Sequence, residues 1–234
     1  MKKYSDIVGR QTLEIMAQAV NYNCWLYGMI KPWIKDPVAE AGAGTGIFSG
    51  LLSVDHSSVT AIDFNSEYLD KAKNLSPNIT TVKFDLQSKR IPPSLQNKFQ
   101  TVVTLNVLEH ISDHLQALIN LRQMLKVGGK LIVLVPAGNW AYGSLDLHLG
   151  HVRRYEIDPL RQLVNQAGFK VIFQRYLNIL GLIGWFVNGK LEKRKILPGW
   201  QLKIFDIISQ PLLWLETKIR FPFGLSILTL AQKV

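Results

Sequence analysis

The sequence predicts a single α/β domain with a mostly parallel β-sheet and helices on both of its faces. Short runs rich in β-branched residues alternate with segments of helical spacing, as in a chain of βαβ units. The first run ends in a glycine-rich turn. The fourth, Phe99 to Val107, is dominated by apolar residues, as expected for a central parallel strand that is covered on both faces.

Length and composition agree with one domain of this class. The chain has 234 residues, 47% of them hydrophobic, which suffices for one substantial core. The single cysteine, Cys24, excludes an internal disulfide and favours a reducing compartment. No signal-peptide pattern is visible, and the longest apolar stretch, Leu177 to Val187, is too short to span a bilayer. We therefore expect a cytoplasmic protein, and its net charge of +10 favours acidic partners.

The N-terminal segment, residues 1–35, is expected to form a helical lid. Residues Ile7 to Ile34 have helical spacing, and the stretch from Asn21 to Tyr27 is dense in aromatic and amide side chains. Two interpretations stay open: the helix packs over the sheet, or Tyr22 or Trp25 covers a bound ligand.

The rest of the chain is organised around the glycine-rich turn after the first strand. That strand ends at Glu40, and Gly42, Gly44 and Gly46 follow at every second position. Glycine permits the backbone angles of a tight turn and the close approach of a ligand. Open α/β sheets bind nucleotides at this edge. The dinucleotide fingerprint needs its third glycine three residues after the second, where this chain has Ile47, so the spacing disfavours NAD.

Two further strands end in acids. The second run, Ser58 to Phe64, contains Asp63 about one βαβ step after Glu40, where a carboxylate can accept hydrogen bonds from both ribose hydroxyls of an adenosine. The third run, Ile79 to Leu86, has Asp85 near its end.

The remaining segments continue the alternation of helices and strands. The expected elements are a helix over 113–125 stopped by Gly128-Gly129, a fifth strand over 130–136, a helix over 158–167, a sixth strand over 169–173 and a last strand over 225–231. Residues 178–223 are too long for a hairpin and carry helical patterns, so we interpret them as a substrate-side insertion.

Taken in order, these motifs resemble the core of class I S-adenosylmethionine (SAM)-dependent methyltransferases over roughly residues 36–137. The match comprises the Glu-x-Gly-x-Gly-x-Gly turn, the acids after strands two and three, the box from Leu105 to His110 and the Gly-Gly strand. The resemblance implies a seven-stranded Rossmann-like sheet whose last strand is antiparallel and inserts between its neighbours. It also implies SAM as cofactor and S-adenosyl-L-homocysteine as product.

The resemblance also implies which residues bind the cofactor and how the chain is divided into functional parts. The implied cofactor-binding residues are Glu40 and Asn106 near the methionine end, Ala41, Gly42 and Gly44 in the turn, Asp63 and Phe64 at the ribose, and Asp85 and Leu86 at the adenine. Within one domain over 1–234, the expected parts are the lid (1–35), the SAM-binding core (36–137), a substrate loop with the sixth strand (138–177), the insertion (178–223) and the last strand (224–234).

The loop after the fifth strand is where we expect the chemistry. Methyl transfer from a sulfonium needs proximity, alignment and a dry site, and an oxygen acceptor usually also needs a base. This loop contains a Gly-His-x-Arg-Arg-Tyr pattern, which resembles a subgroup of bacterial methyltransferases found alongside glycan and lipid biosynthesis enzymes. We predict His151 as the base, then His148, with Asp146 as orienting acid and no metal site; the alternative is that a histidine only ties the loop to the backbone.

The leading hypothesis is a methyltransferase that methylates an oxygen atom of a small-molecule or lipid-like acceptor. Alternatives are a catalytically idle SAM-binding or membrane-associated module and a nucleic-acid methyltransferase. Methylation of base amino groups typically uses a proline-containing box after strand four, and residues 106–109 contain no proline. The basic residues also form no stripe interleaved with stacking aromatics, so nucleic acid is disfavoured.

Residues 178–200 suggest a peripheral membrane contact. Trp185 and Phe186 lie on an apolar stretch, and a basic cluster follows, made of Lys190, Lys193, Arg194 and Lys195. Aromatic residues beside lysines suit the interfacial zone of an anionic bilayer. The alternative is that both aromatic rings belong to the core and the lysines form a solvated face.

Overall fold

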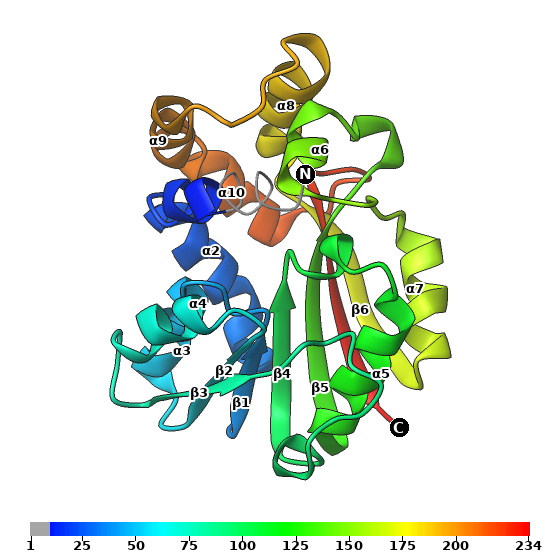
Figure 1. Ribbon diagram of the computed structural model, residues 1–234. Coiled ribbons are helices and arrows are strands. Elements are labelled where there is room, and N and C mark those ends of the chain that lie inside the picture. The colour runs from blue at the N-terminus through cyan, green and yellow to red at the C-terminus, as the bar shows by residue number, and fades with distance from the viewer. Residues whose placement is uncertain (1–9) are drawn as a thin grey trace.

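Seven strands form one sheet in the computed structural model, which describes residues 10–234 (Figure 1). Their order across the sheet is β3-β2-β1-β4-β5-β7-β6. β7 runs antiparallel between β5 and β6, and the other strands are parallel, which confirms the predicted topology. The strands are β1 (Val38–Ala41), β2 (Val59–Asp63), β3 (Ile79–Lys83), β4 (Phe99–Leu105), β5 (Leu125–Pro136), β6 (Phe169–Leu177) and β7 (Ser226–Lys233).

Helices cover both faces of the sheet, and each face has its own buried core. Leu118 and Leu160, from the helices beside β4 to β6, belong to one core, while Leu26, Phe48 and Leu213 belong to the other. The alternating side-chain directions of the central strands supply both cores. The helices are α2 (Val20–Ile30), α3 (Ile47–Asp55), α4 (Ser66–Lys73), α5 (His114–Met124), α6 (Ser144–Leu149), α7 (Ile157–Gln166), α8 (Ile179–Phe186), α9 (Gly199–Ile208) and α10 (Gln210–Lys218).

Several predicted boundaries are wrong, among them the end of the sixth strand, which was expected at Phe173 and lies at Leu177. The helix expected from Ile7 to Ile34 begins outside the described residues, and its described part is interrupted at 17–19 before α2 starts at Val20. The fifth strand begins at Leu125 instead of Lys130, because Leu125 pairs with Phe99 and the glycine pair lies within β5. Tertiary pairing, which local sequence does not record, sets these limits.

The insertion between β6 and β7 forms α8, α9 and α10 at one end of the molecule, where α9 and α10 lie beside α2 and α8 lies next to α6 (Figure 1). Buried carboxylates hold these helices. Glu216 of α10 accepts hydrogen bonds from the backbone N–H groups of Asn178 (2.7 Å) and Ile179 (2.9 Å) at the start of α8. Asp206 of α9 accepts from the N–H groups of Asn21 (3.1 Å) and Tyr22 (2.8 Å) at the start of α2. The insertion is therefore locked onto the N-terminal helix.

Tyr22 and Trp25, which the sequence offered as a cover for a ligand, face this insertion. The Trp25 indole donates to the Leu213 carbonyl at 2.7 Å, and the Tyr22 ring lies 6.2 Å from that of Phe205. Both aromatic residues thus join α2 to α9 and α10. Over the described residues, no helix combines the length and apolar character that a bilayer crossing requires.

Candidate active site

The glycine-rich turn after β1 has positive φ at all three glycines, namely +76° at Gly42, +54° at Gly44 and +83° at Gly46. A Cβ at Gly42 would lie 2.3 Å from a methyl group of Val107, and one at Gly46 would lie 2.4 Å from the Cβ of Ala72. A Cβ at Gly44 would meet only the Leu13 side chain, at 3.5 Å. Packing therefore requires glycine at the outer two positions, whereas the middle one faces freer space.

Two buried carboxylates support this turn. Asp63 accepts hydrogen bonds from the N–H groups of Gly44 (2.9 Å) and Asn65 (2.8 Å), which ties the turn to β2. Burial raises the pKa of Asp63. Glu40 accepts a hydrogen bond from the Ser49 hydroxyl at 2.5 Å, and burial raises its pKa to about 8. The carboxyl ends of β1 and β2 thus present two acids whose protonation is sensitive to their surroundings.

The other cofactor residues implied by the resemblance lie along the same edge, with different exposures. Asn106 follows β4 with φ +54° and is exposed. Phe64 is 67% exposed, so its ring is accessible beside Asp63. Asp85 is exposed, whereas Leu86 is 5% exposed within the core beneath α5. Ala41 is fully buried in β1. Their roles toward a cofactor stay predictions.

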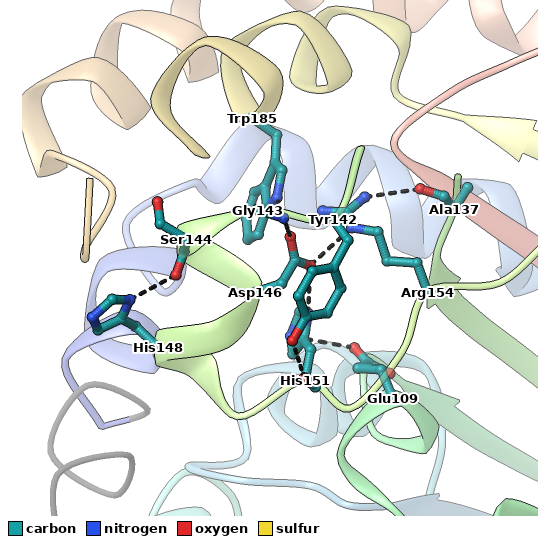
Figure 2. Close-up of polar contacts among 10 residues, drawn as sticks. All are labelled: Glu109, Ala137, Tyr142, Gly143, Ser144, Asp146, His148, His151, Arg154 and Trp185. Carbon is teal, nitrogen blue, oxygen red and sulfur yellow. Dashed lines mark hydrogen bonds and ion pairs between the residues drawn. The ribbon is translucent and has the colours of Figure 1, made fainter. Parts of the chain in front are cut away.

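Asp146 is the centre of a buried polar cluster on the segment after β5 (Figure 2). Its Oδ1 accepts from His151 Nδ1 and from Arg154 Nε, both at 2.8 Å. Its Oδ2 accepts from the Gly143 N–H at 2.9 Å and from the Trp185 indole at 3.0 Å. Although burial opposes ionisation, these hydrogen bonds and the Arg154 charge lower the pKa of Asp146 to about 2. Asp146 is therefore a carboxylate at neutral pH.

His151 is held on several sides. With Nδ1 bonded to Asp146, its Nε2 faces Glu109, 4.0 Å from Oε1. The Trp185 ring stacks parallel to the imidazole at 6.3 Å, and the His110 ring meets it edge-on at 4.7 Å. The carboxylate contact makes Nδ1 the protonated nitrogen, which leaves the lone pair on Nε2. This imidazole is oriented to accept a proton or a cation.

Glu109 is a fully buried acid whose carboxylate oxygens contact no hydrogen-bond partner within residues 10–234. Burial raises its pKa to about 8. Its neighbour Arg154 is 3% exposed and uses Nη1 to bond the Ala137 carbonyl at 2.8 Å, while Nη2 has no hydrogen-bond partner in the described chain. The site therefore contains hydrogen-bonding capacity that its own side chains do not satisfy.

The structure brings together only part of the predicted catalytic set. Asp146 and His151 meet, but His148 Nδ1 contacts the Ser144 carbonyl at 2.7 Å, one turn back on α6, and does not contact Asp146 (Figure 2). The expected loop also contains the helix α6, and Arg154 of the Gly-His-x-Arg-Arg-Tyr pattern is buried against Asp146.

Two residues of the site were missed by sequence reasoning. Trp185 lies in the insertion, where its neighbours suggested a membrane or core role, and Glu109 lies in the box after β4. The available signal for Glu109 was that it is the one acidic residue in the box from Leu105 to His110. No sequence signal linked Trp185 to Asp146.

Comparison with known proteins assigns the family. The sequence model of the methyltransferase domain matches residues 35–174, more than half of the chain. An uncharacterized protein of Methanocaldococcus jannaschii, MJ0638, is 36% identical over 70% of this chain and 68% of its own length. A 2-methyl-6-phytyl-1,4-hydroquinone methyltransferase of Synechocystis is 26% identical over 78% of this chain and 58% of its own length.

A ubiquinone biosynthesis O-methyltransferase of Coxiella burnetii is 27% identical over 40% of this chain and 41% of its own length. Among solved structures, a TehB-like SAM-dependent methyltransferase of Corynebacterium glutamicum superposes with a TM-score of 0.59 at 16% identity, covering 100% of this chain and 99% of the other. That likeness shows the fold, and the domain match shows the family. The chain belongs to the methyltransferase-domain family and is a class I SAM-dependent methyltransferase.

Proposed function

We propose that the protein transfers the methyl group of SAM to a hydroxyl oxygen of an amphipathic small molecule. The observation that carries this proposal is the Asp146–His151 pair, joined at 2.8 Å with both side chains buried. An ionised aspartate fixes the imidazole tautomer, and the free lone pair on Nε2 can take the proton of a hydroxyl as the methyl group arrives. Trp185 and Glu109 enclose the ring and limit access of water.

SAM occupies the carboxyl edge of β1, β2 and β4 in this proposal. An added Cβ at Gly44 would contact only the Leu13 side chain, so the cofactor can approach the backbone there more closely than at Gly42 or Gly46, and Asp63 accepts the ribose hydroxyls. Glu40 and Asn106 contact the methionine end. The exposed Phe64 ring offers an apolar surface beside the ribose. Adenine binds next to Asp85, and Leu86 packs beneath it.

The names of two relatives support the acceptor class. One is an O-methyltransferase of ubiquinone biosynthesis, and the other is named for a hydroquinone with a phytyl chain. Both names describe quinone-type molecules, and the second has a long apolar tail. An acceptor with a polar hydroxyl-bearing head and an apolar tail fits the polar site and the apolar insertion beside it.

The insertion also supports a peripheral contact with an anionic membrane, through which such an acceptor would reach the site. Large apolar side chains are exposed across α8, α9, α10 and the segment that joins α8 to α9, among them Ile183 (60%), Leu191 (67%), Trp200 (61%), Ile207 (69%) and Trp214 (64%). The basic residues of 190–195 follow α8 directly. Trp185 belongs to the Asp146 cluster, so it is not part of this surface.

The base is tested in single-turnover methyl transfer from labelled SAM to a hydroquinone with a short prenyl tail. Loss of a general base typically costs about 10²- to 10⁴-fold in rate. We expect His151→Ala to lose activity in this range and His148→Ala to keep most of it, with SAM affinity unchanged in both. A fall of less than tenfold for His151→Ala, in a protein that binds SAM normally, would rule out the histidine base.

The membrane contact is tested by sedimentation with vesicles. Each basic residue near an anionic surface contributes about 1 kcal/mol. We expect binding to anionic vesicles at low salt, weaker binding at high salt, and little binding to neutral vesicles. Replacing Lys190, Lys193 and Lys195 by Gln should reduce binding without affecting SAM affinity. Equal binding of both proteins would contradict the proposed surface.

A further inference from the structure

We propose that Glu109, His110 and His151 form a binding site for a divalent cation of the zinc class. Their ligand atoms, one from each side chain, all lie within 4.8 Å of one another. Two imidazole nitrogens and one carboxylate oxygen are a donor set that suits such cations, and sites of this composition leave a further position open for water or substrate.

The Glu109 carboxylate is the first argument for a cation. It is fully buried, and neither oxygen contacts a hydrogen-bond partner in the described chain. Leaving a buried polar group unpaired costs free energy, and a buried charge costs more. His151 Nε2 lies 4.0 Å from Oε1 and presents a lone pair to the carboxyl group when Nδ1 holds the proton. A cation between the two atoms satisfies both.

The Asp146 carboxylate is the second, independent argument. A histidine that binds a metal usually donates its other ring N–H to a carboxylate or carbonyl, which fixes the ring and raises its basicity. Asp146 Oδ1 contacts His151 Nδ1 at 2.8 Å, and Asp146 is itself fixed by Arg154, Gly143 and Trp185. The imidazole is thus already held with Nε2 directed toward Glu109.

His110 supplies the third ligand and the entry path. Its ring meets that of His151 at 4.7 Å, and its side chain is exposed, unlike those of the other two ligands. Ligand distances to zinc are about 2.0–2.2 Å, so the ligand atoms must move closer together when the cation binds. Because His110 is the exposed ligand, we expect its side chain to make most of this movement.

This cation site goes beyond the proposed function, because binding requires neither SAM nor an acceptor. The two uses of His151 exclude each other: a nitrogen bound to a cation has no lone pair for a proton. The metal-free protein is therefore the form in which His151 acts as the base. Failure of the base test leaves the cation proposal standing, and the reverse also holds.

The test is titration of the full-length, tag-free, chelator-treated protein with Co²⁺, followed by visible absorption, and with Zn²⁺, followed by calorimetry. We expect one equivalent to bind and Co²⁺ to give the absorption of a low-coordinate nitrogen–oxygen site. Glu109→Gln and His110→Ala should each weaken binding at least tenfold. Asp146→Asn should weaken it about 10- to 100-fold, as expected for a group that orients a ligand.

His56→Gln is the matched control, because His56 pairs with Asp36 at 2.8 Å, outside the cluster. It should bind like the unaltered chain. His110→Ala changes an exposed side chain, so it keeps the test valid if the buried variants fail to fold. Absence of a stoichiometric cation, or equal affinity in His110→Ala and the unaltered protein, would overturn the assignment.

Discussion

Gly42 and Gly44 both lie in the glycine-rich turn, but their surroundings in the structure differ. At Gly42 an added Cβ would overlap Val107 at 2.3 Å, whereas at Gly44 the nearest atoms are 3.5 Å away. Both have positive φ, which side chains rarely adopt. The first glycine therefore serves packing, and the second serves access to the turn.

We predict that Gly42→Ala lowers the free energy of unfolding by about 1–3 kcal/mol, through overlap and backbone strain. The Val107→Ala background removes the overlap but not the strain, so the loss should be smaller there. Gly44→Leu should instead mainly weaken SAM binding. Urea unfolding and calorimetry separate the two effects, and an equal stability loss in both Gly42→Ala backgrounds would contradict the packing argument.

A second residue-scale prediction concerns Asp63. Hydrogen bonds to charged groups contribute about 1.5–3 kcal/mol each, so Asp63→Ala should weaken SAM binding at least tenfold. Asp63→Asn keeps one oxygen that can accept the Gly44 N–H and should lose less. Calorimetric titration of the folded variants measures this. Unchanged affinity in Asp63→Ala would remove Asp63 from the cofactor site.

At the scale of elements, buried carboxylates hold the insertion in place by accepting hydrogen bonds from backbone N–H groups at the N-termini of helices. Glu216 accepts two N–H groups at the start of α8, and α8 places Trp185 on Asp146. The Asp146 cluster is therefore connected to the far end of the insertion through one helix.

We predict that Glu216→Ala lowers the free energy of unfolding by about 2 kcal/mol, because each lost cap costs about 1 kcal/mol. Methyl transfer should fall as well, since α8 no longer holds Trp185 in place, while SAM affinity should stay the same. Glu192→Ala, on the exposed turn after α8, is the control. Normal methyl transfer in a destabilised Glu216→Ala protein would show that the site does not depend on how Glu216 holds α8.

Most of the fold could be predicted at this scale. Parallel strands that are covered on both faces carry continuous apolar runs, and these runs located the strands. The resemblance then placed the last strand antiparallel between its neighbours, as observed. The split near Ala17 and the early start of β5 at Leu125 depend on contacts with distant segments, namely Asp206 and Phe99. Local periodicity contains no record of such contacts.

The site was only half predictable for the same reason. Asp146 and His151 are five residues apart, so their meeting follows from residue types within one segment. Trp185 and Glu109 reach the cluster from separate parts of the chain. Burial of Glu109 without a hydrogen-bond partner is a property of the folded interior, and a sequence pattern does not display it.

For the whole molecule, the buried acids make stability depend on pH. Burial raises the pKa of Glu109 and of Glu40 to about 8, so the folded chain holds protons that the unfolded chain has already released. Their contribution to the free energy of unfolding is therefore highest below the ordinary carboxyl pKa of about 4.3 and falls as pH rises toward 8. Asp146 acts in the opposite sense, because its lowered pKa stabilises the fold above pH 4 and this contribution is lost as pH falls toward 2.

We predict that Glu109→Gln flattens the decline of stability between pH 5 and pH 8. One unit of pKa difference corresponds to about 1.4 kcal/mol. Between pH 5 and pH 8, the free energy of unfolding of the variant should therefore fall by at least about 1 kcal/mol less than that of the unaltered protein. Urea unfolding at both pH values checks this. Parallel pH profiles would show that Glu109 titrates alike in the folded and unfolded chains.

The strands on either side of the insertion are themselves hydrogen-bonded neighbours, with Leu177 of β6 opposite Ser226 of β7. The chain thus leaves the sheet and returns to it at neighbouring positions. The residues between Leu177 and Ser226 are encoded by one contiguous part of the gene. Exchanging that piece between relatives would alter which molecules reach the Asp146 cluster while the cofactor half of the protein keeps its strand register. Diversification of acceptors in such a fold can proceed by recombination at one pair of adjacent junctions, without coordinated change elsewhere in the sheet.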